Sequence, residues 1–299
     1  MLTVLRPVVV GLDGSLESLA AADWAAREAL RRGLPLRLVH AYEGLTPEAS
    51  RLPELEAPRS WAAGILRGAM DRINERYPQL RLSADQISRP ATDTLVRAGE
   101  EAELLVLGSR ALSGFYGFTA GSVALATVAR ATRPVVLVRA GRTSEDERLP
   151  DAEGRPSARA PYREVVVGVD TSHPCEEVLG FAFENAALRN APLRVVHTCR
   201  PPGLLGAANA EAEVIARRTA EQALAAATGP WREKFPTVRV CDVVQSGRPV
   251  PQLLREAEDA GLLVVGREHR PAGLGVRTGP VAHAVMHHVR CPVAIVPHA

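Results

Sequence analysis

The sequence has almost no lysine. Lys234 is the only one among 36 basic residues, so the other 35 are arginine. P-loop nucleotide hydrolases need a lysine after their glycines, protein kinases need one on a strand, and pyridoxal enzymes need one for their Schiff base. Lys234 lies in the segment WREKFP, which fits none of these contexts. The sequence therefore argues against all three enzyme classes.

Long apolar runs, paired cysteines and a large net charge are also missing. No stretch approaches the roughly 18 apolar residues of a membrane span, and the first apolar run stops at Asp13, too early for a signal peptide. The four cysteines form no CxxC pair, which is typical of reduced thiols. The net charge of +2 provides no strong field for nucleic acid or membrane. We expect a cytoplasmic protein that binds neither.

The chain repeats itself at an offset of 157 residues. Val8–Asp13 aligns with Val165–Asp170, and 14 of the 35 paired positions that begin at Val8 are identical. After one inserted residue, Leu104–Gly108 matches Leu262–Gly266. Self-similarity of this kind indicates two copies of one folding unit.

The segment between the copies is rich in charged residues, serine and proline and has few large apolar side chains. Such a composition is typical of a linker that cannot bury enough surface to order itself. We therefore expect a first domain at residues 1–141, a linker at residues 142–161 and a second domain at residues 162–299.

Within the first copy, short apolar runs alternate with longer segments of helical period. Continuous β-branched runs suit strands that are buried on both faces of a parallel sheet. Alternating strands and helices predict a doubly wound α/β sheet, whose ligands bind at the carboxyl ends of the strands. The predicted strands are residues 8–10, 36–39, 81–87, 104–107 and 135–138, and the predicted helices are residues 15–32, 59–76, 90–101 and 122–131.

A glycine-rich loop joins the fourth predicted strand to the last predicted helix of this copy. It leaves the strand at Gly108 and enters the helix at Gly121-Ser122. Glycines allow a close backbone approach, and the first amides and the dipole of a helix favour an anion. Ser122 adds a hydroxyl and Arg110 adds a cation. The loop therefore predicts a phosphate site, with a plain helix-capping loop as the alternative.

These features together resemble the universal stress protein family. The motifs are VVVGLDGS at the start of the repeat, His40-Ala41 after the second strand, and the spacing G-x2-G-x9-G-[S/T]. Gly108, Gly121 and Ser122 fit that spacing, and Ala111 replaces its second glycine. The resemblance implies two tandem Rossmann-like domains with five-stranded parallel sheets in the strand order 3-2-1-4-5. It also implies an ATP site, with Mg²⁺ able to accompany the phosphates, formed by Gly11, Asp13, Ala41, Gly108, Ser109, Arg110, Ala111, Gly121, Ser122 and Val123.

The second copy departs further from this pattern. Gly266 and Gly279 keep the spacing, but His269 replaces the second glycine and Pro280 replaces the serine. Proline suits a first helical turn but provides neither an amide hydrogen nor a hydroxyl. We expect a degenerate second site that retains Asp170, Gly266 and Gly279.

The resemblance implies a regulatory ATP-binding protein with at most slow hydrolysis and no catalytic residues. Two alternatives stay open: a nucleotide-free interaction protein with a dimerisation half, and an ATP-using enzyme. Asp13 could serve as a general base, but it has no partner acid or nucleophile in the repeat. His283 and His287 have helical metal-binding spacing without an acidic or cysteine ligand, so we expect no metal site.

Each copy ends in a short apolar strand, at residues 135–138 and 293–296. In the order 3-2-1-4-5 this strand is an edge with unpaired backbone groups. The resemblance implies that the last strands of two units pair. We therefore expect the two halves to form an intrachain pseudo-dimer, while a homodimer of whole chains is left open.

Overall fold

The computed structural model describes residues 5–42, 56–109, 121–173, 175–199, 210–268 and 278–298. The chain divides into two compact units, Met1–Arg142 and Thr143–Ala299. Three residues singled out above, Arg110, Ala111 and His269, lie outside the described residues.

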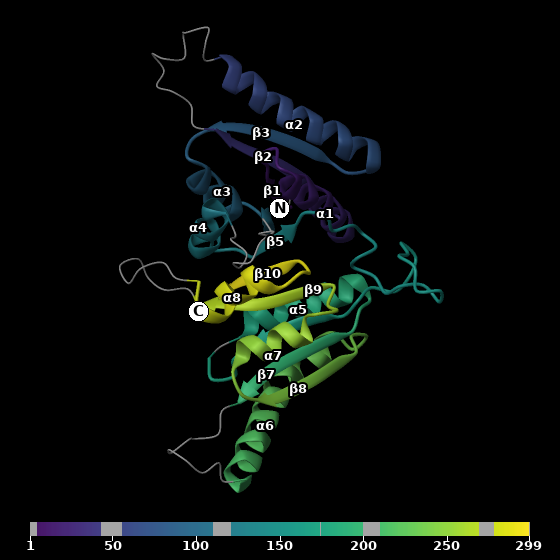
Figure 1. The fold of residues 1–299 in the computed structure, drawn as a ribbon, viewed down its shortest axis with the longest axis vertical. Helices are drawn as coiled ribbons and strands as arrows, with labels where there is room; N and C mark the ends of the chain where they lie inside the picture. The colour runs from purple at the N-terminus through teal and green to yellow at the C-terminus, as the bar shows by residue number, and fades with distance from the viewer. Residues whose placement is uncertain are drawn as a thin grey trace. The chain divides into compact units, whose positions relative to one another are not determined.

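The first unit is a parallel sheet with helices on both faces (Figure 1). Its strands follow the order β3-β2-β1-β4-β5, and each neighbouring pair is parallel. This confirms the predicted doubly wound fold and its strand order. The elements are β1 (Val8–Gly11), α1 (Leu16–Arg32), β2 (Leu36–Tyr42), α2 (Glu56–Arg76), β3 (Leu82–Ser88), α3 (Ala91–Glu100), β4 (Leu104–Ser109), α4 (Ser122–Arg130) and β5 (Val135–Arg139).

The β-branched runs lie in the centre of this unit. Val8, Val9 and Val10 of β1 are fully buried, because α1 and α2 cover one face of the sheet and α3 and α4 cover the other. Two strands that are central in this order, β1 and β4, lie side by side although a long stretch of chain separates them. Their carboxyl ends therefore form the switch point at which α/β sheets bind ligands.

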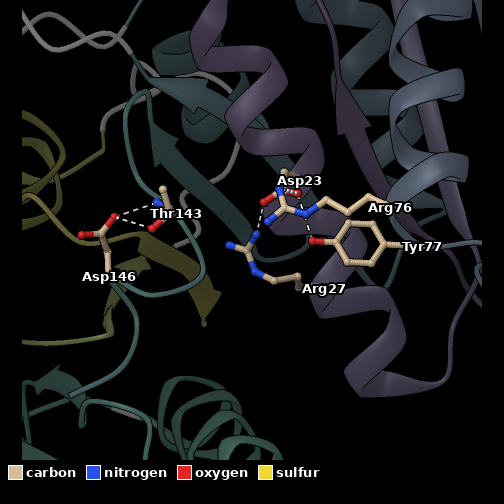
Figure 2. A network of polar contacts seen from close by, with 6 residues as sticks. All are labelled: Asp23, Arg27, Arg76, Tyr77, Thr143 and Asp146. Atoms are coloured by element: carbon tan, nitrogen blue, oxygen red, sulfur yellow. Dashed lines mark hydrogen bonds and ion pairs between the residues drawn. The ribbon is translucent and has the colours of Figure 1, made fainter. Parts of the chain in front are cut away.

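Local sequence determines both ends of α1. The Ser15 side chain accepts a hydrogen bond from the Ser18 amide at the start, and Gly33 ends the helix in the left-handed conformation with φ 65°. Asp23 then joins α1 to the end of α2, accepting from Arg76 at 2.9 Å and from the Tyr77 hydroxyl at 3.0 Å (Figure 2). These hydrogen bonds hold α1 and α2 together on one face of the sheet.

The second unit repeats the fold in the order β8-β7-β6-β9-β10, with α5 and α6 in contact with each other and α7 in contact with α8. The corresponding valines of β6 are again fully buried. The elements are β6 (Val165–Val169), α5 (Glu176–Arg189), β7 (Leu193–Cys199), α6 (Ala210–Lys234), β8 (Val240–Ser246), α7 (Pro249–Glu256), β9 (Leu262–Glu268), α8 (Pro280–His288) and β10 (Val293–His298).

Strand β10 pairs with β9 in parallel, with Ile295 opposite Val265. The Leu263 amide donates to the Pro292 carbonyl at 3.0 Å. Because backbone groups alternate in direction along a strand, the even-numbered residues of β10 bond to β9. The Ile295 amide therefore points away from β9, toward the other edge of the strand.

The segment expected to be an unstructured linker is more ordered than its composition predicts. Thr143 donates its amide and hydroxyl to Asp146 (Figure 2), and Arg148 forms an antiparallel bridge with Tyr162. The guanidinium carbon of Arg148 lies 3.8 Å from the centre of the Tyr162 ring. A cation–π contact and backbone pairing supply the stabilisation that the segment's own apolar residues cannot.

Candidate functional site

The first unit has a cleft of about 290 Å³ at the carboxyl ends of β1 and β4. Seven of the predicted site residues line it: Gly11, Asp13, Ala41, Gly108, Gly121, Ser122 and Val123. Ser109 does not, because it is buried at the end of β4. The structure adds nine residues that the predicted site did not include: Leu12, Ser15, Glu17, Ser18, Val39, Ala91, Leu95, Leu107 and Ala124. The lining residues from the first turns of α1 and α3 could have been predicted from the sequence, because both helices begin at the carboxyl edge of the sheet.

Asp13 is held at one wall of this cleft by the start of α1. Its Oδ1 atom accepts from the Ser15 amide at 3.0 Å and from the Ser15 hydroxyl at 2.5 Å, and its own amide donates to Ser18 Oγ at 3.4 Å. These bonds fix the carboxylate at a helix N-terminus, where negative charge is stabilised. A carboxylate in this position can accept hydrogen bonds from the hydroxyl groups of a ligand.

Gly108 has a different role from the one its motif suggests. A Cβ atom at this position would lie 2.6 Å from the backbone carbon of Glu17 and 2.7 Å from the Ser18 nitrogen. The glycine therefore allows the first turn of α1 to pack directly on β4. Packing within the protein therefore requires glycine at position 108, whether or not a ligand also approaches it.

The N-terminus of α4 forms the opposite wall. Gly121 has φ −53° and ψ 149°, and an added Cβ would meet no atom of the described residues within 4 Å. The Leu125 amide donates to the Gly121 carbonyl at 3.0 Å, which closes the first turn. The amides of Ser122, Val123 and Ala124 come before this bond and belong to the turn whose donors have no acceptor within a helix. This wall can therefore bind an anion.

His40 lies beneath the cleft edge and is nearly fully buried. Its Nδ1 atom donates to the Leu12 carbonyl at 2.7 Å, and His197 makes the same bond to the Val169 carbonyl at 3.0 Å. Both histidines connect the end of one strand to the end of its neighbour. This geometry supports a structural role for them.

The second unit has a larger cleft at the equivalent edge, of about 540 Å³. The three residues of the predicted degenerate site, Asp170, Gly266 and Gly279, all line it, together with Pro280. The Ser172 amide and hydroxyl donate to Asp170 Oδ1 at 3.0 and 2.5 Å. Burial favours a higher pKa for Asp170, but these bonds outweigh it and hold the pKa below its ordinary value of 3.8. The carboxylate is therefore ionised at neutral pH.

Three further features bear on the sequence expectations. Among the described residues, no group of three or more histidine, cysteine or acidic side chains could hold a metal ion, although the rings of His283 and His287 lie 4.5 Å apart. No helix in the described ranges is long and apolar enough to cross a membrane. The cysteines are free thiols, with Cys199 and Cys291 buried, Cys175 half-buried and Cys241 exposed.

Two doubly wound units in one chain, each with a cleft at its sheet switch point, define a tandem Rossmann-like α/β protein. The sequence model of the universal stress protein family matches residues 5–139 and 161–297. The universal stress proteins Rv2005c and Rv2623 of Mycobacterium tuberculosis are 31% and 30% identical to the chain, each across 96% of it and across 96% and 95% of their own lengths. The chain belongs to the universal stress protein family.

Solved structures are also similar to the chain. A universal stress protein from Archaeoglobus fulgidus aligns with a TM-score of 0.66 at 14% identity, covering 98% of both chains. A universal stress protein solved in complex with cAMP is 28% identical over 46% of this chain and 99% of its own, with a TM-score of 0.38.

Proposed function

We propose that this protein is a regulatory ATP-binding protein whose first unit holds the nucleotide. One observation carries the proposal: the cleft of the first unit lies between the Asp13 wall and the first turn of α4, whose amides have no acceptor within the helix. The phosphates would bind these amides and the Ser122 hydroxyl, where the helix dipole favours negative charge. The adenosine would lie toward Asp13 and Ala41, and Mg²⁺ could accompany the phosphates.

The proposal includes no catalytic residue. Asp13 uses its carboxylate to accept hydrogen bonds from Ser15, and His40 and His197 each donate to a main-chain carbonyl. Occupancy of the cleft would then act through the shape of the protein or through its partners. The spacing of the free cysteines favours a reducing, cytoplasmic setting.

Calorimetric titration of the full chain with ATP tests this function. We expect one ATP per chain, because Pro280 removes one donor and one hydroxyl from the second cleft. A chain that binds no ATP and carries no nucleotide after purification would leave the nucleotide-free interaction protein as the better interpretation. Products that accumulate from ATP and Mg²⁺ at a catalytic rate would instead favour an enzyme.

A further inference from the structure

The second cleft differs from the first because α5 begins later than α1. At the repeat offset of 157 residues, Leu16 corresponds to His173, yet α5 starts only at Glu176. Among the described residues, the atoms nearest to a Cβ at Gly266 are therefore side-chain atoms, in place of the helix backbone that packs on Gly108 in the first unit. The nearest atoms to a Cβ at Gly266 would be those of the His298 ring at 2.7 Å and the Val178 side chain at 3.1 Å. The cleft is larger as a result.

The carboxylate of the wall next to β6 is preserved between the two units, although His173 replaces Leu16 and its Nδ1 atom lies 3.5 Å from Asp170 Oδ2. Asp170 accepts from Ser172 at the distances that Asp13 shows with Ser15. Thr198 replaces Ala41 and adds a hydroxyl to the lining. A carboxylate at this edge of a Rossmann-like sheet is the group that accepts hydrogen bonds from ribose hydroxyls. This wall therefore keeps the means to bind a nucleoside.

The opposite wall, at the start of α8, is altered. Pro280 occupies the first helical position and donates no hydrogen bond, whereas Ser122 has both an amide and a hydroxyl. Gly279 has φ 74°, against −53° for Gly121, so the chain enters α8 from a different direction. Glu268, the last residue of β9, stands where the first unit has Arg110 in the sequence, and the one arginine of the described lining, Arg267, is buried. This end is poorly suited to phosphates.

We propose that the second cleft is a binding site for an uncharged nucleoside and selects against the nucleoside triphosphate. The inference rests on the proposed function of the first unit, because the internal repeat assigns the nucleoside end of the cleft. The protein would then respond to two ligands through two units of one fold. The class of ligand follows from the preserved carboxylate wall and the altered helix wall.

Calorimetry on the full chain with adenosine and ATP as probes tests this site. Ala41→Trp fills the first cleft and Thr198→Trp fills the equivalent place in the second, and both positions are half-exposed. We expect the Ala41→Trp variant to bind one adenosine per chain. It should bind ATP at least about tenfold more weakly than adenosine, because the second cleft lacks a hydrogen bond to the charged phosphates. The double variant should bind neither. Pro280→Ser in the Ala41→Trp background should restore ATP binding.

A second measurement needs no substitution. Cys175 is half-buried and lines the second cleft, so adenosine should protect it from a thiol-specific reagent, while exposed Cys241 serves as the internal control. The reaction is run at mildly alkaline pH, because burial and nearby carboxylates, Asp170 among them, raise the pKa of the Cys175 thiol. ATP at the same concentration should protect Cys175 less.

The outcomes separate this inference from the proposed function. If Thr198→Trp binds one ATP but Ala41→Trp binds no adenosine, or binds ATP as tightly as adenosine, the second site is wrong and the first stands. If Thr198→Trp binds no ATP, the proposed function of the first unit fails whatever happens at Cys175. Equal protection of Cys175 by adenosine and ATP would also overturn the selectivity.

Discussion

Gly121→Asp separates ligand binding from folding in the first unit. The glycine has φ −53°, which any residue adopts, and an added Cβ meets no atom within 4 Å in the part of the chain that the structure describes. Aspartate at this N-cap position also satisfies helix amides better than glycine does. We therefore expect the free energy of unfolding to stay the same or to rise by about 0.5 kcal/mol.

The same carboxylate should remove ATP binding. It would occupy the amides that the phosphates need and would repel the phosphates. Each lost hydrogen bond to a charged group costs about 1.5–3 kcal/mol. Since 1.4 kcal/mol is about a tenfold change in Kd, we expect at least a hundredfold loss of affinity.

Calorimetry with ATP gives the affinity, and urea unfolding gives the stability. Gly121→Ala is the matched control: it adds a Cβ without charge or capping and should bind ATP within about threefold of the wild type, well below one lost hydrogen bond. Gly121→Asn caps the helix without a charge and should fall between the two. If a folded Gly121→Asp variant binds ATP as the wild type does, the phosphates do not bind at the start of α4.

Three further substitutions test other features. Ser15→Ala removes the cap of α1 and should lower the free energy of unfolding by about 1 kcal/mol, measured in urea; an unchanged value would show that the cap contributes nothing. Gly108→Ala forces a Cβ against the backbone of α1 and should cost about 1–3 kcal/mol, whereas Gly266→Ala, which meets side-chain atoms of His298 and Val178 and no described backbone atom among its nearest neighbours, should cost less; equal costs would contradict this explanation. Ile295→Pro removes an amide that points away from β9 and should loosen the predicted pseudo-dimer without unfolding the first unit. Solution scattering that is unchanged from the wild type would count against that pairing.

Much of the fold follows from local sequence. Ser15 and Gly33 define the ends of α1, and the β-branched run at residues 8–10 predicts the buried central strand. The strand order comes from the family resemblance, because no short-range pattern determines which strands become neighbours. The motif spacing likewise brings Gly121 and Ser122 to the cleft, since a helix after a parallel strand begins near the carboxyl edge.

The remaining features depend on contacts between distant segments. The packing role of Gly108 depends on how closely α1 approaches β4, and no local pattern encodes that distance. The order of the segment before β6 comes from Arg148 and Tyr162, which are far apart in sequence. The late start of α5, in contrast, could have been predicted from the sequence. Pro174 disfavours a helical conformation at His173, the residue before it.

The packing of Gly108 changes how the family's glycine motif should be used as a diagnostic. A chain that had lost every ligand would still be under selection to keep a glycine there, because α1 could not otherwise pack on β4. A side chain at Gly121 would meet no atom of the described residues within 4 Å, so their packing places no such demand on it. When first units of this kind are sorted into binders and non-binders, the glycine at the position of Gly121 is therefore the informative one, and the glycine at the position of Gly108 reports only that the unit folds.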